Sequence, residues 1–275
     1  AGVVQLLPGR GETVGAKLTS DNRVRGVMFT GSTEVASLLQ RNIATRLDAQ
    51  GRPTPLIAET GGMNAMIVDS SALTEQVVVD VLASAFDSAG QRCSALRVLC
   101  LQDDVADHTL KMLRGAMAEC RMGNPGRLTT DIGPVIDAEA KANIENHIQT
   151  MRAKGRPVFQ AVRENSEDAR EWQTGTFVPP TLIELASFDE LKKEVFGPVL
   201  HVVRYNRNNL NALIDQINAS GYGLTLGVHT RIDETIAQVT GNAKVGNLYV
   251  NRNMVGAVVG VQPFGGEGLS GTGPK

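Results

Sequence analysis

A cysteine follows glycine, glutamine and arginine in the stretch FDSAGQRCSALRVL, residues 86–99. The thiolate is the reactive form of cysteine, and a helix terminus or a nearby cation such as Arg92 favours the thiolate. A buried structural cysteine would need neither the glycine nor the cation. This setting indicates that Cys93 is a nucleophile, although a lone cysteine is more often a small hydrophobic residue. Cys100 and Cys120, in an apolar run and a helical pattern, fit that second interpretation.

Histidines give little support to a cysteine–histidine hydrolase, because His108, His147, His201 and His229 all lie in helix or strand patterns away from Cys93. Residues distant in sequence can still meet in space, so this alternative stays open. The three cysteines show no CxxC spacing. An odd count without that spacing argues against a disulfide framework or a structural zinc site and suits a reducing cytoplasm.

Two motifs place glycine directly after a strand. In FTGST, Gly31 and Ser32 begin a helical pattern, and the N–H groups of a helix N-terminus can hold a phosphate. In PLIAETGG, Glu59 ends an apolar segment, where ligands often bind in α/β sheets, and the glycines behind it permit close approach of a cofactor. An ordinary capped helix and a surface glutamate before a turn are the simpler alternatives.

Two later motifs are weaker when taken singly. Glu194 and Phe196 flank a Gly-Pro turn in KKEVFGPVL, as in many helix–strand connections. Phe264 lies in QPFGGEGLSGTG, which is too rich in glycine for a regular element and too apolar for a linker. Glycine-rich loops of this kind often line binding sites.

The composition excludes several classes of protein. The chain of 275 residues carries a net charge of −2, so nothing in its charge suggests binding to nucleic acid or to an anionic membrane. No apolar run approaches the roughly 18 residues of a membrane span. The first residues lack the basic region of a signal peptide. They also lack an initiator methionine, and the last residues stop within a glycine-rich loop, so we expect a piece of a longer protein.

Short apolar segments alternate with helical patterns along the chain, which predicts a layered α/β fold with a mostly parallel sheet. Strands are expected at residues 3–7, 24–30, 55–59, 64–69, 97–102, 157–162, 181–185, 198–205, 226–230 and 247–251. Helices are expected at residues 32–47, 73–89, 105–122 and 138–155. The longer helices begin near residue 70, where we expect a second lobe.

The motifs FTGS, Glu-x-Gly-Gly, Gly-Gln-x-Cys, Glu-x-Phe-Gly-Pro-Val and Pro-Phe-Gly-Gly follow one another in this order. In that order they resemble the aldehyde dehydrogenase superfamily. The stretches LIAETGGMNAMIVDSSA, SAFDSAGQRCSALRVL and QPFGGEGLSGTGPK are similar to the Δ1-pyrroline-5-carboxylate (glutamate semialdehyde) dehydrogenase module of bifunctional proline-catabolic flavoenzymes. The resemblance covers the whole chain but only the C-terminal half, or slightly more, of such an enzyme.

The resemblance implies three segments. Residues 1–69 would be the remnant of a Rossmann-like NAD-binding domain, residues 70–250 the catalytic cysteine domain, and residues 251–275 a substrate anchor loop with a return segment. FAD would belong to a separate proline dehydrogenase domain that these residues do not contain. The parent protein would be cytoplasmic and a homo-oligomer, and its association with a membrane surface stays open.

The implied chemistry is oxidation of an aldehyde by NAD⁺. Cys93 would attack the aldehyde to give a thiohemiacetal, hydride would leave to NAD⁺, and Glu59 would activate the water that hydrolyses the thioester. The implied cofactor contacts are Gly31, Ser32, Thr60, Gly61, Glu194 and Phe196. Thr60 stands where many family members have leucine. The preference for NAD⁺ over NADP⁺ depends on the resemblance alone.

The implied substrate is L-glutamate γ-semialdehyde. Gly256 and Ala257 would bind its carboxylate through backbone N–H groups, Ser94 would donate a hydroxyl hydrogen bond, and Phe264 would wall its aliphatic part. Two alternatives stay open. One is an aldehyde dehydrogenase with another semialdehyde or aliphatic substrate, and the other is a truncated, non-catalytic module. For residues 1–275 alone we expect low activity.

Overall fold

The computed structural model describes residues 2–48, 50–162, 172, 174–258 and 260–274. The chain divides into two compact units, Ala1–Thr60 and Gly61–Lys275. This division comes earlier than the expected boundary at residues 69 and 70, because the strand Ala65–Val68 pairs within the sheet of the second unit. Residues 251–275 also belong to the second unit.

The first unit contains a small parallel sheet. Its elements are a π-helix (Gly11–Gly15), α1 (Ala16–Ser20), β1 (Val27–Thr30), α2 (Thr33–Ala44) and β2 (Leu56–Glu59). The two strands pair in parallel, with Thr30 opposite Glu59. The Ser32 hydroxyl accepts a hydrogen bond from the Val35 N–H at 3.3 Å, so Ser32 caps α2.

The strand expected at residues 3–7 is wrong. These residues are assigned no strand, and the side chains of Val3, Val4 and Leu6 are almost fully exposed. A strand needs a neighbour for its backbone N–H and C=O groups, and an apolar run alone does not supply one.

The second unit is built on a seven-stranded sheet with the order β10-β9-β3-β4-β7-β6-β5 among the described residues. In chain order the strands are β3 (Ala65–Val68), β4 (Val98–Gln102), β5 (Val158–Gln160), β6 (Thr181–Leu185), β7 (Val199–Tyr205), β9 (Thr225–His229) and β10 (Asn247–Val250). All neighbours run parallel except β5 and β6. The predicted mostly parallel α/β fold is confirmed.

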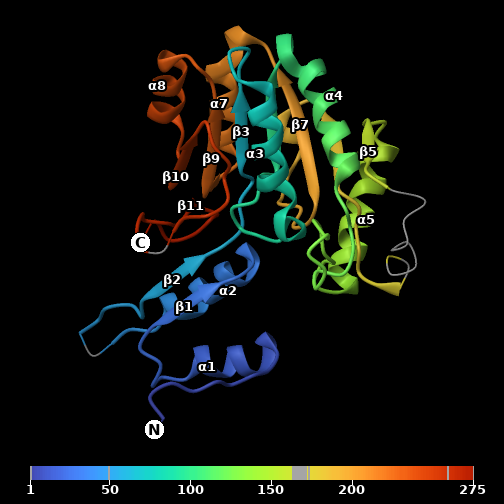
Figure 1. Cartoon of the computed structure of the whole chain (residues 1–275). Helices are drawn as coiled ribbons and strands as arrows, with labels where there is room; N and C mark the ends of the chain where they lie inside the picture. The colour runs from blue at the N-terminus through green and yellow to red at the C-terminus, as the bar shows by residue number, and fades with distance from the viewer. Residues whose placement is uncertain (1, 49, 163–171, 173, 259, 275) are drawn as a thin grey trace. The chain divides into compact units, whose positions relative to one another are not determined.

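Helices and short elements complete the second unit. The helices are α3 (Thr74–Phe86), α4 (Asp103–Glu119), α5 (Ala138–Ala153), α7 (Leu210–Ala219) and α8 (Asp233–Asn242). The short elements are 3-10 turns at Asp87–Gly90, Phe188–Glu190 and Arg207–Asn209 and a small antiparallel pair, β8 (Tyr222–Gly223) and β11 (Glu267–Gly268). Helices α3 and α4 pack side by side in front of the sheet (Figure 1). The sequence did not predict α7 or α8.

The core of the second unit lies on the central strands, where every residue of β4 is buried. Burial raises the pKa of the Cys100 thiol to about 12, so this cysteine is a structural residue, as the sequence indicated. Of the helices in the described part of the chain, none is both long enough and apolar enough to cross a bilayer.

The amino ends of β9, β3, β4 and β7 lie along one edge of the sheet, because these four neighbours are parallel. Asn64 precedes β3, Cys93 and Arg97 precede β4, Glu194 precedes β7, and Thr225 begins β9. Parallel pairing therefore collects residues that are far apart in the sequence.

Candidate active site

The loop before Cys93 takes an unusual backbone path. Helix α3 ends at Phe86, and three successive residues then adopt positive φ angles: Ser88 at 57°, Ala89 at 53° and Gly90 at 65°. Such angles are uncommon for residues with a side chain and cluster at functional sites. Cys93 follows this turn and is partly exposed.

Gly90 also has no room for a side chain. A Cβ atom at this position would collide with the carbonyl oxygen of Gly197 and would lie 2.6 Å from its carbonyl carbon. The carbonyl oxygen of Ala85 would be 2.9 Å away. Glycine in the Gly-Gln-Arg-Cys motif is therefore required both by its φ angle and by the close approach of another backbone segment.

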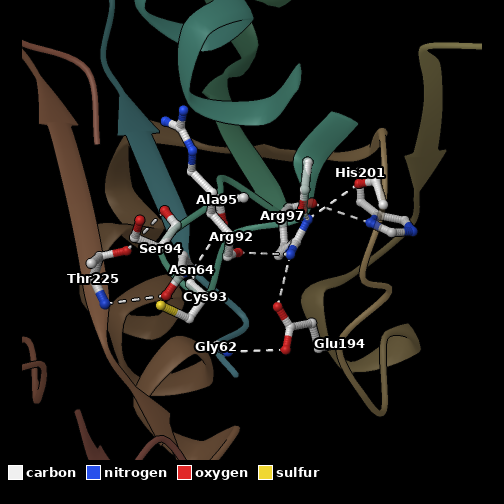
Figure 2. Close-up of polar contacts among 12 residues, drawn as sticks. Gly62, Asn64, Arg92, Cys93, Ser94, Ala95, Arg97, Glu194, His201 and Thr225 are labelled. Carbon is white, nitrogen blue, oxygen red and sulfur yellow. Dashed lines mark hydrogen bonds and ion pairs between the residues drawn. The ribbon is translucent and has the colours of Figure 1, made fainter. Parts of the chain in front are cut away.

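Arg97 joins the cysteine loop to the turn that carries Glu194. Its side chain is fully buried, and every N–H of its guanidinium has an acceptor. Nε and Nη2 donate to Glu194 Oε1 at 3.1 and 2.9 Å. Nη1 donates to the carbonyls of Gly90 at 2.7 Å and Gly197 at 3.2 Å, and Nη2 donates to the carbonyl of Arg92 at 3.0 Å. Figure 2 shows Arg97 between Glu194 and the loop.

The electrostatics of Arg97 involve Cys93. Burial lowers the pKa of the guanidinium, while the Glu194 carboxylate and the thiolate form of Cys93 raise it. Because this interaction is mutual, the guanidinium in turn favours the Cys93 thiolate. The sequence drew attention to Arg92, whose Nε donates to Ser88 Oγ at 3.1 Å. Arg97 is a second and fully buried cation at this site.

Asn64 holds the other side of the cysteine loop. Its Nδ2 donates to the carbonyls of Cys93 and Ala95, each at 2.8 Å. Its Oδ1 accepts from the Thr225 N–H at 3.1 Å (Figure 2). The buried amide thus ties the nucleophile loop to the first residue of β9. The Ser94 carbonyl accepts from the Thr225 hydroxyl at 3.5 Å, and Ser94 itself is buried.

The Glu194 carboxylate is fixed at both oxygens. Arg97 binds Oε1, and Oε2 accepts from the backbone N–H of Gly62 at 3.2 Å. A Cβ at Gly61 would collide with Oε2, so any larger residue there would displace the carboxylate from this position. Phe196 remains 46% exposed, and the Arg97 guanidinium carbon lies 5.1 Å from the centre of its ring. The carboxylate and the ring thus lie beside one buried cation.

Two histidines lie next to the backbone of Arg97. The Nε2 atoms of His147 and His201 are 2.8 Å apart, and His201 Nδ1 lies 3.1 Å from the Arg97 carbonyl. Burial lowers the pKa of both imidazoles, that of His201 to about 3. Both are therefore neutral at neutral pH, and the hydrogen bonds of His201 hold it to Arg97 and His147.

Four of the predicted site residues, Gly31, Ser32, Glu59 and Thr60, lie at the carboxyl end of the small sheet in the first unit. Glu59 is the last residue of β2, and its carbonyl accepts from the Gly31 N–H at 3.1 Å. The Ser32 hydroxyl caps α2, as described above. Thr60 is buried and ends the unit. Glu59 and Cys93 thus belong to different units of the chain.

The beginning of the expected substrate loop is hydrogen-bonded to α3, near the C-terminal end of that helix. The Met254 N–H donates to Ser84 Oγ at 2.9 Å. Gly256 adopts a φ of +58°, and its N–H donates to the Met254 carbonyl at 2.9 Å. Ala257 and Phe264 are both partly exposed.

The structure therefore brings Cys93, Ser94 and Glu194 together at one edge of the sheet and places Gly61 against Glu194. The sequence did not identify Asn64 or Arg97. The available signal was a polar residue at the entrance of each of two apolar strands, NAMIV and RVLCL. Among the described residues, none form a group of three histidine, cysteine or acidic side chains that could hold a metal ion.

Comparison with known proteins identifies the family. The model of the aldehyde dehydrogenase family matches residues 1–275. The chain is 92% identical over 274 residues to the bifunctional protein PutA of Escherichia coli K12, covering all of this chain and 21% of that protein. It is 34% identical over 277 residues to a 1-pyrroline-5-carboxylate dehydrogenase of Bacillus cereus B4264, covering 52% of that protein.

Solved structures agree. The crystal structure of a bifunctional PutA protein superposes with a TM-score of 0.89 at 51% identity, covering 97% of this chain and 26% of the other. A 1-pyrroline-5-carboxylate dehydrogenase from Thermus with bound NAD gives a TM-score of 0.88 at 35% identity, covering 98% and 51% of the two chains. The chain therefore spans about a fifth of the PutA relative and about half of the single-function one. On this evidence the chain belongs to the aldehyde dehydrogenase family.

Proposed function

We propose that the protein containing this chain oxidises L-glutamate γ-semialdehyde to glutamate with NAD⁺, as a step of proline catabolism. The observation that carries the proposal is Cys93, partly exposed after a strained turn and held from both sides by the buried side chains of Asn64 and Arg97. The substrate follows from the names of the relatives, 1-pyrroline-5-carboxylate dehydrogenase and bifunctional PutA.

Cys93 would act as the nucleophile. Its thiolate adds to the aldehyde carbon and forms a thiohemiacetal, and the buried Arg97 favours that thiolate. The backbone N–H of Cys93 would donate to the developing oxyanion. Asn64 and Arg97 bind carbonyl groups of the loop, so they fix its peptide planes before substrate arrives.

Glu59 would act as the general base in the second half of the reaction. It would take a proton from water, which attacks the thioester carbon and releases glutamate and the Cys93 thiolate. Loss of a general base typically reduces a rate by roughly 100-fold or more.

The residues around Glu194 fit a nicotinamide cofactor. The carboxylate is already oriented by Arg97 and Gly62, and Phe196 presents an exposed ring beside it. Glu194 would bind the ribose hydroxyl groups and Phe196 would pack against the ring. NAD⁺, when bound, accepts the hydride that leaves the thiohemiacetal.

The remaining cofactor contacts would come from Gly31, Ser32 and Thr60 of the first unit and Gly61 of the second. Gly31 and Ser32 stand at the start of α2, where the helix N-terminus favours a pyrophosphate. Thr60 and Gly61 would lie near the nicotinamide.

The substrate carboxylate would be bound by the loop that contains Gly256 and Ala257. Because the Gly256 N–H donates to the Met254 carbonyl, this bond has to open if Gly256 is to bind the anion. Ser94 and Phe264 would contact the rest of the substrate. We also expect the protein to be a cytoplasmic homo-oligomer.

The test is NADH formation by the full-length protein, with L-glutamate γ-semialdehyde compared with propanal. We expect a strong preference for the semialdehyde, loss of activity in Cys93→Ala, and normal activity in the matched variant Cys120→Ala. Glu59→Gln should give a stoichiometric burst of NADH followed by slow turnover, because thioester formation survives and its hydrolysis does not. Equal turnover of both aldehydes would reject the substrate, and an active Cys93→Ala variant would reject the mechanism.

A further inference from the structure

We infer that Arg97 is a positioning residue that couples the proposed cofactor carboxylate, Glu194, to the proposed nucleophile, Cys93. The inference extends the proposed function, in which Arg97 favours the Cys93 thiolate but is not linked to Glu194. It depends on Cys93 being an activated thiol and not on which aldehyde is the substrate.

The coupling has a continuous physical basis. One planar, fully buried guanidinium donates to Glu194 Oε1 on one side and to the carbonyls of Gly90 and Arg92 on the other. These carbonyls lie three residues and one residue before Cys93. A movement of the Glu194 carboxylate, or a change in its charge, therefore reaches the nucleophile loop through a single rigid group.

The arrangement requires arginine. The guanidinium has a fixed fork of N–H donors, and each of them is used at Arg97. A lysine ammonium has three donors from one point and cannot span Glu194, Gly197 and the cysteine loop at once. The His201 contacts with the Arg97 carbonyl fix the backbone from which this fork extends.

The charges determine the sign of the coupling. The guanidinium favours the Cys93 thiolate, and the Glu194 carboxylate partly neutralises that guanidinium. Neutralising Glu194 should therefore favour the thiolate, and removing Arg97 should disfavour it. A ligand that binds the Glu194 carboxylate would change the stability of the Cys93 thiolate in the same way, through Arg97.

The experiment measures the rate of iodoacetamide alkylation at each of the three cysteines of the chain, by peptide mapping, across a range of pH. The variants are Arg97→Met, Glu194→Gln and the double variant. The matched controls are Arg114→Met and Glu184→Gln, which change another ion pair in the same way. The buried Cys100 reports any loosening of the fold, because it can react only if the core opens. The partly exposed Cys120 gives the rate at which the reagent alkylates an ordinary thiol.

We expect Arg97→Met to move the midpoint of the Cys93 profile to higher pH and to slow alkylation at neutral pH by about 10-fold or more. Glu194→Gln should move the midpoint to lower pH, and this shift should vanish in the Arg97→Met background. A Glu194→Gln shift that persists without Arg97 would show direct action on Cys93 and overturn the inference. An unchanged midpoint in Arg97→Met would overturn it as well.

The outcomes separate this inference from the proposed function. If Cys93 in the parent chain alkylates no faster than Cys120, the proposed nucleophile itself is rejected. If Cys93 is reactive and the Arg97 variants leave its profile unchanged, only the coupling fails. Should Cys100 become reactive in Arg97→Met, Arg97→Lys provides the second variant: it keeps the charge and loses the fork, and we expect a slower Cys93 reaction with Cys100 still protected.

Discussion

Replacing Gly90 by alanine should destabilise the second unit through two separate effects. The first is the backbone angle, because a φ of 65° costs a residue with a Cβ about 1–2 kcal/mol relative to glycine. The second is steric, because the new Cβ would meet the carbonyl group of Gly197 and the carbonyl oxygen of Ala85. Overpacking of this kind typically costs about 1–3 kcal/mol. The expected loss of unfolding free energy is therefore about 2–5 kcal/mol, from the sum of these two ranges.

Gly155 provides the matched control. It has a φ of +73°, and a Cβ there would meet no atom within 4 Å. Gly155→Ala should therefore cost only the backbone term, about 1–2 kcal/mol. Urea unfolding of both variants, followed by circular dichroism, measures the difference. If the two variants lose the same free energy, the close approach of the Gly197 carbonyl to Gly90 is not the constraint inferred above.

Two further predictions concern the core and the histidine pair. Leu99→Ala, at a fully buried position of β4, should lower the unfolding free energy by about 2–5 kcal/mol. The control Leu128→Ala, at a fully exposed position, should change it by less than about 0.5 kcal/mol. Equal effects of the two variants in urea unfolding would contradict the assigned core. Burial lowers the pKa of His201 from 6.5 to about 3, so the unfolded chain binds an extra proton between these values, and the unfolding free energy should fall as the pH drops through this window. His201→Gln should flatten that dependence, and an unchanged slope would refute the assignment.

Local pattern was enough to predict most of the fold. Short apolar segments alternating with helical patterns predicted β1 to β7, β9, β10 and α2 to α5, because the central strands are continuous apolar runs and the helices carry apolar residues at helical spacing. Pattern alone did not identify the buried face of α2: Val35 and Leu38 follow the apolar helical spacing of residues 32–47 but are exposed, while Ala36 is buried. Helix α8 was missed because Val239 is its only buried residue.

The candidate site was predicted less completely than the fold. Cys93 and Glu194 were predicted as site residues because each lies in a recognisable local motif. Arg97 and Asn64 were missed because their roles depend on partners that are distant in sequence. Glu194 is 97 residues from Arg97, and Thr225 is 161 residues from Asn64. A sequence shows that such a side chain lies just before a strand, but the order of strands in the sheet determines which residues it contacts.

This distance has a consequence for biosynthesis. The Asn64 side chain can reach its Thr225 partner only after the ribosome has added a further 161 residues, the last of which is Thr225 itself. Until β9 pairs with β3, the Asn64 amide that binds the Cys93 carbonyl lacks its Thr225 partner. Contacts of such long range form late, because closing the intervening loop costs entropy before the contact is gained. A nascent chain should therefore acquire the complete set of Asn64 contacts around the cysteine loop only after β9 has been synthesised and has paired with β3.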